Sequence, residues 1–385
     1  MQWIPSDINL PIVEKSKYFI FVSLALIAIS IISLATRGIN YGIDFAGGYE
    51  IHVKFDKDVD VSAMKKALNE GLHMGEPVVQ RFGSADLHEF LIRIKKTKSV
   101  DDASLQRAKK ALEAAAGAES IQAFSYSAEN GERVTIEAAK TIADDVITKA
   151  FSDQALKVQS ISASQRQDKP VYTVTLVSVG ERVDRILKST FNIEKKESLL
   201  SRMDYVGPQV GEQLRNQGIQ AILYALVFIL IYIALRFDFL FSPGAILALV
   251  HDVLITLGVF SLFGLEFNLP TIAALLTIVG YSLNDTIVEF DRIRELIAHF
   301  KDRQIDITVN QAINNCLSRT MITSLTTFLV TVALLIWGGS SIFDFSLALC
   351  IGVVAGTWSS IFIACPSYLW LRHKVDAKAA AAKGK

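Results

Sequence analysis

The stretch 270-PTIAALLTIVGYSLNDTIVEF-290 is apolar over most of its length, yet it carries a carboxylate, Asp285, well inside it. A helix needs about 20 mainly apolar residues to cross the roughly 30 Å hydrocarbon layer of a membrane. The stretch is therefore predicted to span a membrane as a helix. Five further stretches of this kind predict six spans in all, and they run from about Tyr18 to Ala35, Ile219 to Leu235, Pro243 to Phe263, Thr320 to Trp337 and Phe343 to Leu371.

The first of these spans has a second interpretation, as a cleaved signal peptide, because Lys15 and Lys17 precede its apolar run. The run is long, however, and no small-residue cleavage site follows it. We therefore interpret it as a retained membrane anchor.

Composition narrows the class of protein further. The chain has 385 residues, of which 51% are hydrophobic, and its 39 basic residues balance 39 acidic ones. A nucleic-acid binder needs a basic excess to displace counterions, so no nucleic acid is expected as a partner. Cys316, Cys350 and Cys365 all lie in the apolar C-terminal half, which argues against a disulfide framework or a thiolate metal site.

Basic residues close to the spans predict the orientation of the chain. They gather at one set of span ends and are Lys15, Lys17, Arg236, Arg292, Arg294, Lys301, Arg303, Arg372, Lys374 and Lys378. The opposite turns, 264–269 and 338–342, contain no Lys or Arg, so both termini are expected in the cytoplasm. The expected order is a cytoplasmic segment 1–17, a first span 18–36, an outer domain 37–212, five spans within 213–371 and a cytoplasmic tail 372–385.

The polar region is expected to fold as an α+β domain. Period-two and 3.6-residue patterns predict strands and helices in the order β-α-β-β-α over Gly48–Phe55, Val61–Leu72, Pro77–Phe82, His88–Ile94 and Asp102–Ala116, with a turn at Gly83–Asp86. This order is typical of a ferredoxin-like split βαβ unit, whose last strand is expected around Arg202–Val206. Residues 120–195 are then an insertion, with a helix over Val134–Phe151 and a strand over Val171–Val177.

The fold class predicted is thus an α-helical membrane protein with six transmembrane helices and a ferredoxin-like α+β domain inserted between helices 1 and 2. The sequence contains no GxGxxG, P-loop, HExxH or nucleophile-elbow pattern, so neither an enzyme nor a cofactor is expected. His52, His73 and His88 are scattered, and we interpret them as surface residues rather than metal ligands.

Ionisable residues inside the spans are the candidate functional residues. Each costs roughly 2.5–3.5 kcal/mol on insertion scales and is kept where it faces a polar interior or a partner. Asp252, preceded by His251, lies near the middle of the third span. Asp285, preceded by Asn284, lies in the inner half of the fourth span, and Arg319 begins the fifth.

Asp285 and Arg319 are close enough in depth to form an ion pair. Asp285 lies five residues inward of Phe290, which is about 7–8 Å at 1.5 Å per residue. The alternative is that Arg319 extends to the headgroups and only orients the protein. Glu289 and Asp291, at the wet edge of the fourth span, are interpreted as surface charges.

A buried carboxylate that a proton or an arginine can neutralise has two states separated by a modest energy. This is the physical requirement for a proton relay coupled to conformational change. Moving one charge across a membrane releases about 2.3 kcal/mol per 100 mV, enough to bias such a change. The candidate proton pathway consists of Asp285 and Arg319, with Asn284 and Asp252 beside them.

Six separated motifs carry a family resemblance. They are Gly42-Ile-Asp-Phe-Ala-Gly-Gly48, Val206-Gly-Pro-Gln-Val-Gly211, Leu235-Arg-Phe, His251-Asp-Val, Gly280-Tyr-Ser-Leu-Asn-Asp-Thr-Ile-Val-Glu-Phe-Asp-Arg-Ile-Arg-Glu295 and Ser318-Arg-Thr-Met-Ile-Thr-Ser-Leu-Thr-Thr327. Together they resemble the SecF family, the smaller membrane subunits of SecD–SecF complexes in the resistance-nodulation-division superfamily. The structural residues of the first two motifs are Asp44, Gly47, Gly48, Gly207, Pro208 and Gly211. We expect a tight turn at the glycine pair and a matching re-entry at the proline.

The resemblance implies a subunit of the bacterial inner membrane with a periplasmic domain. Its implied partners are SecD, the SecYEG translocon, the unfolded preprotein and the lipid bilayer, and its implied energy source is the proton gradient. Asp285 and Arg319 match the family's proton-pathway residues. Two residues depart from the family pattern, since Glu289 stands where an apolar residue is usual and Ser318 where Asn is common. The outer domain is also longer than is typical.

Two other functions stay open from the sequence. A small-molecule efflux protein of the same superfamily would call for about twice this length and two outer domains. A passive assembly factor would need the spans only as anchors and would tolerate loss of Asp285. Coupling to protons or to sodium ions is not distinguished.

Overall fold

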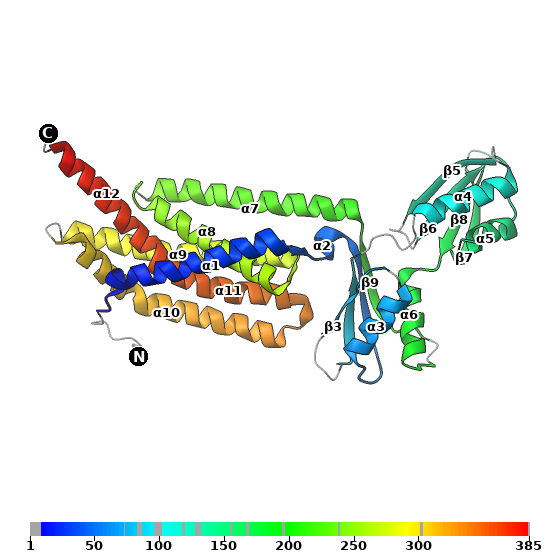
Figure 1. Cartoon of the computed structure of the whole chain (residues 1–385), viewed down its shortest axis with the longest axis horizontal. Helices are drawn as coiled ribbons and strands as arrows, with labels where there is room; N and C mark the ends of the chain where they lie inside the picture. Colours follow the sequence, from blue (N-terminus) through cyan, green and yellow to red (C-terminus); the bar gives the residue numbers. More distant parts are fainter. Residues whose placement is uncertain are drawn as a thin grey trace. The chain divides into compact units, whose positions relative to one another are not determined.

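The computed structural model describes residues 9–72, 74–82, 87–95, 102–117, 120–127, 132–154, 156–166, 169–194, 197–237, 239–300 and 303–383 (Figure 1). The chain divides into a helical unit, Met1–Gly42 with Arg215–Lys385, and an inserted unit, Ile43–Leu214. His73, Lys301 and the turn expected at 83–86 lie outside the described residues.

Within the described residues, six helices are long and apolar enough to cross a membrane. They are α1 (Ile12–Arg37), α7 (Pro208–Arg236), α8 (Ser242–Phe263), α9 (Leu269–His299), α10 (Ile305–Trp337) and the continuous helix Phe343–Lys378. Each predicted span lies inside one of them, so the six-span prediction is confirmed. The last helix begins after a 3₁₀ turn, η3 (Ser340–Ile342), and is itself composed of α11 (Phe343–Ser359), a π-helical turn η4 (Ser360–Ala364) and α12 (Cys365–Lys383).

Capping residues define the loop between α8 and α9. Gly264 ends α8 with a φ of +64°, which suits a residue without a side chain. Asn268 begins α9, and its side chain accepts a hydrogen bond from the Thr271 N–H at 3.1 Å. Two short parallel strands, β1 (Asn40–Tyr41) and β10 (Glu266–Phe267), pair across this loop. The C-terminal end of α1 and the α8–α9 loop therefore lie at the same end of the helical unit.

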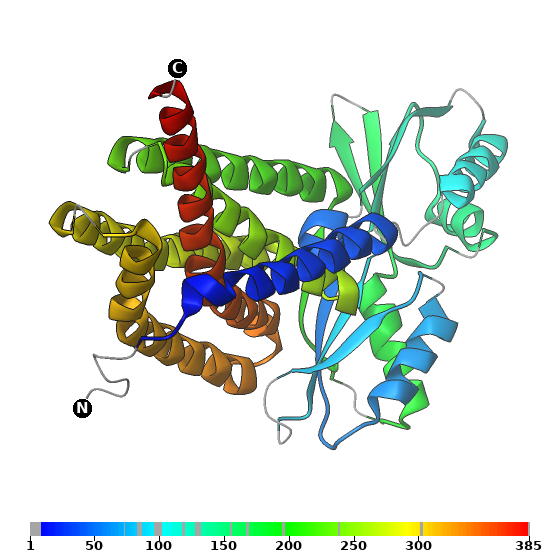
Figure 2. The same ribbon diagram turned by 60° about the vertical axis from the view of Figure 1, so that its left-hand side comes forward.

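The helical unit has an inner and an outer set of helices (Figures 1 and 2). The apolar windows of α8, α9 and the last helix are 50%, 56% and 56% buried, whereas those of α1, α7 and α10 are 17%, 11% and 17% buried. Small residues let the inner helices approach their neighbours closely. A Cβ on Gly258 of α8 would lie 2.1 Å from Ser30 of α1, and one on Gly352 of α11 would lie 2.2 Å from Ile278 of α9.

The inserted unit contains a four-stranded antiparallel sheet in the order β3-β4-β2-β9. Its elements are β2 (Gly48–Lys54), α3 (Val61–Leu72), β3 (Val78–Phe82), β4 (Glu89–Ile94), α6 (Val179–Thr190) and β9 (Leu200–Val206). Asp60 caps α3, because its carboxylate accepts hydrogen bonds from the Ser62 and Ala63 N–H groups at 3.2 and 3.0 Å. Both helices pack on one face of the sheet, where Ile51, Met64 and Val183 are buried together.

The second helix that packs on the first sheet is not the one that we predicted. We expected the helix 102–116 there, but the structure has α6, which lies within the segment 120–195 that we predicted to be an insertion. The helix α4 (Asp102–Ala116) forms as predicted, but its Leu105, Ala108 and Leu112 pack in a separate apolar cluster. Both helices are amphipathic, and helical periodicity alone does not say which sheet a helix covers. The last strand, β9, forms where it was expected and pairs with β2.

The separate cluster belongs to a second antiparallel sheet in the order β5-β6-β8-β7. Its elements are β5 (Ile121–Ser127), β6 (Arg133–Ala138), α5 (Asp144–Ser152), β7 (Val158–Arg166) and β8 (Lys169–Leu176), with α4 and α5 packed on one face (Figure 2). The single helix predicted over 134–151 was wrong. Val134, Ile136 and Ala138 alternate on the buried face of β6, a period-two pattern, and the helix begins only at Asp144. The strand predicted over 171–177 is confirmed as β8.

The close crossing of α1 and α8 yields a stability prediction. Gly258→Ala should lower the free energy of unfolding by about 1–3 kcal/mol, because the added methyl group collides with Ser30. Gly280→Ala is the matched control, since a Cβ there meets nothing within 4 Å. Unfolding can be followed with a thiol-reactive dye, because all three cysteines are buried. Equal unfolding temperatures for the two variants would contradict the prediction.

Candidate functional site

Among the described residues, three carboxylates lie buried on the membrane-spanning helices. Asp252 is 0% exposed on α8, and Asp285 and Glu289 are 5% and 1% exposed on α9. An apolar interior contains no water to solvate such groups, so each has to find hydrogen-bond donors within the protein. The three carboxylates differ in the hydrogen-bond donors that surround them.

Asp252 is enclosed by polar groups from three helices. Ser282 of α9 and Ser359 of α11 donate hydroxyl hydrogen bonds to its Oδ2 at 2.6 and 2.9 Å. His251 Nδ1 lies 2.9 Å from its Oδ1, and both side chains are buried. This predicted residue is therefore fully satisfied and fixed between α8, α9 and α11.

Asp285 has a looser arrangement. Ser324 of α10 donates to its Oδ2 at 3.4 Å, and Thr357 of α11 in turn donates to Ser324 at 2.7 Å. Ser324 and Thr357 also line a groove of about 250 Å³ between α10 and α11, whose other walls include Phe328 and Trp358. A short chain of hydroxyl groups thus connects this open groove to the Asp285 carboxylate.

The two polar residues expected to act with Asp285 lie at the surface of the chain. Arg319 and Asn284 are both exposed on membrane-spanning helices, α10 and α9. The sequence analysis inferred that Arg319 and Asp285 could form an ion pair. Among the described residues, no ion pair joins them in this conformation. Ser318, which departs from the family pattern, neighbours Arg319 on α10.

Glu289 is not the wet-edge residue that we expected. Ser360 donates to its Oε1 at 3.4 Å, and the Cys365 thiol donates to its Oε2 at 3.1 Å. Asp291 does lie at the edge, where its exposed carboxylate pairs with Arg236 and Arg294 at 2.8 and 2.9 Å. Two residues along α9 rotate the side chain by about 200°, so Glu289 faces the interior and Asp291 faces outward.

Hydroxyl groups on one short segment serve all three acids. Thr357 reaches Asp285 through Ser324, Ser359 bonds to Asp252, and Ser360 bonds to Glu289. The sequence analysis missed these partners. The run 357-TWSS-360 inside an apolar span was the available signal, because hydroxyl side chains clustered in a membrane helix mark polar contacts between helices.

The glycine motifs pack against each other in the inserted unit. Gly47 and Gly48 have φ values of +74° and +140°, and a Cβ on Gly48 would lie 2.2 Å from the Ile94 carbonyl oxygen. A Cβ on Gly211 would lie 3.0 Å from the Phe45 carbonyl oxygen. The remaining motif residues are Asp44 in the short helix α2 (Ile43–Ala46), Gly207 after β9, and Pro208 at the start of α7. The motif residues therefore shape backbone contacts at the entry and exit of the inserted unit.

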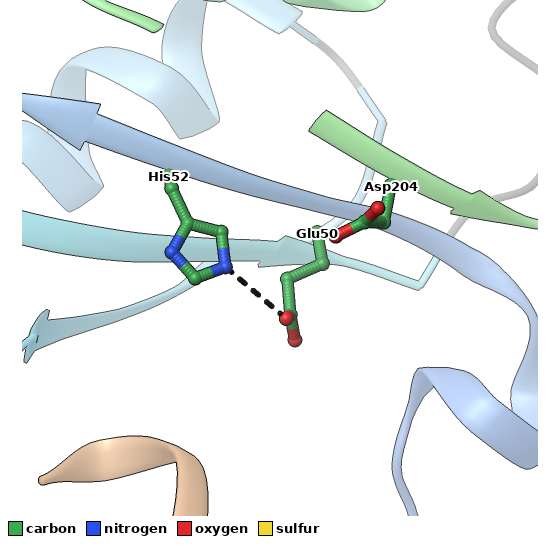
Figure 3. Close-up of side chains that lie close together, drawn as sticks. All are labelled: Glu50, His52 and Asp204. Atoms are coloured by element: carbon green, nitrogen blue, oxygen red, sulfur yellow. Dashed lines mark hydrogen bonds and ion pairs between the residues drawn. The ribbon is translucent and has the colours of Figure 1, made fainter. Parts of the chain in front are cut away.

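A possible ligand set for a metal ion lies on the first sheet, on the face opposite its helices (Figure 3). Side-chain atoms of Glu50, His52 and Asp204 lie within 4.8 Å of one another. Each carboxylate already has a guanidinium partner, since Arg93 lies 2.8 Å from Glu50 and Arg202 lies 2.7 Å from Asp204. A cation bound there would face two positive charges, so we keep the prediction that His52 is not a metal ligand.

The fold and the site define a multi-pass membrane protein. It has an inserted α+β unit and buried acidic side chains on its inner membrane helices. A family model described as "Protein export membrane protein SecD/SecF, C-terminal" matches residues 185–374, and one described as "SecD/SecF GG Motif" matches residues 32–59. The SecF protein translocase subunit of Magnetococcus marinus is 39% identical, covering 96% of this chain and 95% of its own. That of Calditerrivibrio nitroreducens is 36% identical, covering 94% of each chain.

Solved structures agree with these sequence comparisons. SecDF from Thermus thermophilus, described as a translocon-associated membrane protein, matches with a TM-score of 0.63 at 30% identity and covers 96% of this chain. SecDF in its super-membrane-facing form matches with a TM-score of 0.60. This chain spans 40% of the length of the first SecDF chain. The chain belongs to the SecF family of protein translocase subunits, which confirms the resemblance stated from its motifs.

The enclosure of Asp252 predicts a graded loss of stability. Asp252→Leu would leave the Ser282 and Ser359 hydroxyls and the His251 imidazole without their partner, at about 1–3 kcal/mol for each unsatisfied group in soluble proteins and less in membrane bundles. We expect about 2–4 kcal/mol in total, and less than half of that for the isosteric Asp252→Asn. Thermal unfolding with the thiol-reactive dye measures both variants. Equal stability of the two would show that the hydrogen bonds contribute little.

The arrangement of Glu50, His52 and Asp204 on the first sheet predicts that metal binding does not depend on His52. Calorimetric titration of the purified protein with zinc should give the same heats for the parent and for His52→Ala, because Arg93 and Arg202 already neutralise the neighbouring carboxylates. A binding isotherm that disappears in His52→Ala would contradict this prediction.

Proposed function

We propose that the chain acts with SecD in Sec-dependent protein export and that it couples the proton motive force to the late steps of that export. Membership of the SecF family supports the export role. The match to two solved SecDF structures, of which this chain covers 40% and 41%, supports the association with SecD. The further proposed partners are the SecYEG translocon, the unfolded preprotein and the lipid bilayer.

The observation that carries the coupling proposal is the position of Asp285. It is buried in a membrane-spanning helix, and its side-chain hydrogen-bond donor among the described residues is the neutral hydroxyl group of Ser324. A cationic residue, Arg319, lies on the same helix as Ser324 and forms no ion pair with Asp285. A carboxyl group in this situation is stabilised either by taking up a proton or by attracting the guanidinium group. The two alternatives require different positions of α9 and α10, which links protonation to movement of the helices.

Exposure of Arg319 and Asn284 supports a second membrane subunit as the completing partner. Charged and amide side chains on membrane-spanning helices normally face a polar interior or another protein rather than lipid. In the chain taken alone, both side chains are exposed. We propose that SecD covers this surface and encloses Asp285, Asn284 and Arg319 in a shared proton pathway, with Asp252 as the fixed group beside it.

The proposed placement is the bacterial inner membrane, with both termini in the cytoplasm and a ferredoxin-like periplasmic domain. Basic residues at the opposite end of the helical unit from the β1–β10 pair support the orientation, and Arg236 and Arg294 at that end bind Asp291. The order β-α-β-β-α-β of the first sheet and its helices supports the ferredoxin-like assignment.

Two substitutions test the coupling. Asp285→Asn should remove the part of export that depends on the proton gradient, because the amide neither binds nor releases a proton, while the complex with SecD still assembles. Arg319→Lys should impair export as well, since charge remains but forked hydrogen bonding is lost. Glu295→Gln is the control, because Glu295 lies on α9 with Asp285 but is exposed.

The measurement is preprotein export into inverted membrane vesicles with and without a proton gradient, together with co-purification of SecD. Gradient-dependent export that persists in Asp285→Asn would leave only the passive assembly role. A sodium gradient that substitutes for the proton gradient would identify the other coupling ion.

A further inference from the structure

The last membrane helix contains a break in its regular geometry. Residues Ser360–Ala364 form a π-helical turn between α11 and α12, in which the Cys365 N–H donates to the Ser360 carbonyl oxygen. Such turns make up well under 1% of residues in proteins and occur mostly at functional sites. A turn of this kind loses regular hydrogen bonding, so its presence needs a local reason.

The π-helical turn places two donors on one carboxyl group. Ser360 and Cys365 are five residues apart, and in a regular α-helix their side chains would point about 140° away from each other. In the π-helical turn, both reach Glu289, Ser360 at Oε1 and Cys365 at Oε2, at 3.4 and 3.1 Å. Both side chains are fully buried. The turn thus builds a closed two-point site around the Glu289 carboxyl group.

Neighbouring helices close tightly over this site. A Cβ on Gly244 of α8 would lie 2.5 Å from the carbonyl oxygen of Ala364 in the π-helical turn, so only glycine allows this approach. A Cβ on Gly244 would also lie 3.4 Å from Phe290, which packs with Phe241 and Tyr368, and Phe241 and Tyr368 are stacked at 4.0 Å between ring centroids. Glu289 itself is 1% exposed, so the site is closed within the chain.

Among the residues that the structure describes, Glu289 has no cationic partner. The ionisable groups near it are Asp285 one turn earlier on α9, Cys316 on α10 and Cys365 on α12. Among the described residues, no lysine, arginine or histidine lies within ion-pair distance of it, and Arg292, the nearest basic residue along α9, binds Glu295 at 2.7 Å instead. A carboxylate enclosed in this way is costly, and the neutral acid is the form that the site tolerates without a partner.

Asp285 and Glu289 are also coupled to each other. Residues at positions i and i+4 of a helix are neighbours, with Cβ atoms roughly 5–6 Å apart. Two carboxylates at this separation in an apolar interior do not both ionise readily, so a proton on one favours charge on the other. Ser360 on the last helix donates to Glu289, and Thr357, three residues earlier, donates to the Ser324 hydroxyl group that serves Asp285.

We propose that Glu289 is a second proton-binding group of the helical unit, built by the π-helical turn, and that it shares a proton with Asp285. This proposal rests on the proposed proton coupling through Asp285 but concerns a different residue. Glu289 stores the proton in the closed interior, and Asp285, whose hydroxyl partners reach the open groove, exchanges it. The step is a proton transfer between two carboxyl groups and needs no other reactant.

Infrared spectroscopy of the full chain in complex with SecD, reconstituted in liposomes, tests the proposal. The carbonyl-stretch band of a buried protonated carboxyl group should be present at neutral pH and lost in Glu289→Gln. Ser360→Ala and Cys365→Ala, which each remove one donor, should shift the frequency of that band. Glu295→Gln should leave it unchanged, and thermal unfolding confirms that each variant is folded.

Asp285→Asn separates this proposal from the proposed function. The Glu289 band should remain in that variant, but its pH dependence should move toward acid, because the competing negative charge is gone. A band that Glu289→Gln leaves intact, or no such band at any pH, would overturn the proposal. An unchanged pH dependence in Asp285→Asn would overturn the shared proton. If export persists in Asp285→Asn while Glu289→Gln loses the band, the proposed coupling fails and the Glu289 site remains.

Discussion

A carboxylate in the middle of a membrane has to be satisfied by the protein itself, because the hydrocarbon offers neither water nor hydrogen-bond donors. In this chain, the hydroxyl run Thr357–Ser360 on the last span meets most of this requirement. It reaches Asp252 directly, Glu289 directly and Asp285 through Ser324. The position of this one helix segment therefore determines the surroundings of all three acids, and a small movement of it would alter all three together.

Close packing is what makes those hydrogen bonds specific. Glycines at the helix crossings bring backbones together, and the opposing side chains pack closely against them. The three acids nonetheless differ in access. Asp252 is held by donors from three helices and has no evident freedom, while the hydroxyl partners of Asp285 line a groove that opens between α10 and α11. Asp285 therefore has the fewest side-chain hydrogen bonds of the three acids among the described residues, as its proposed exchange of partners requires.

Sequence patterns revealed the spans and most of the inserted unit, because hydrophobic length and periodicity are local properties. They also singled out Asp252 and Asp285, since a charge in an apolar run is visible without a structure. Burial of Glu289 could not be predicted in this way, because it depends on which side of α9 faces the core and on a π-helical turn in a distant span. The prediction that α4, rather than α6, packs on the first sheet was wrong for a similar reason. The amphipathic pattern of a helix shows which face is buried but not which sheet that face packs against.

Two polar side chains are exposed on the surface of the helical unit. Arg319 and Asn284 are exposed on helices that also carry the buried Asp285, so the polar centre is open on one side. An exposed guanidinium group among lipid tails is unfavourable unless a partner supplies an acid or a polar cavity. The SecDF chain that this protein resembles is about two and a half times as long, and this chain covers 40% of it. The exposed side of this polar centre, at Arg319, is therefore where the proposed second set of membrane helices would pack.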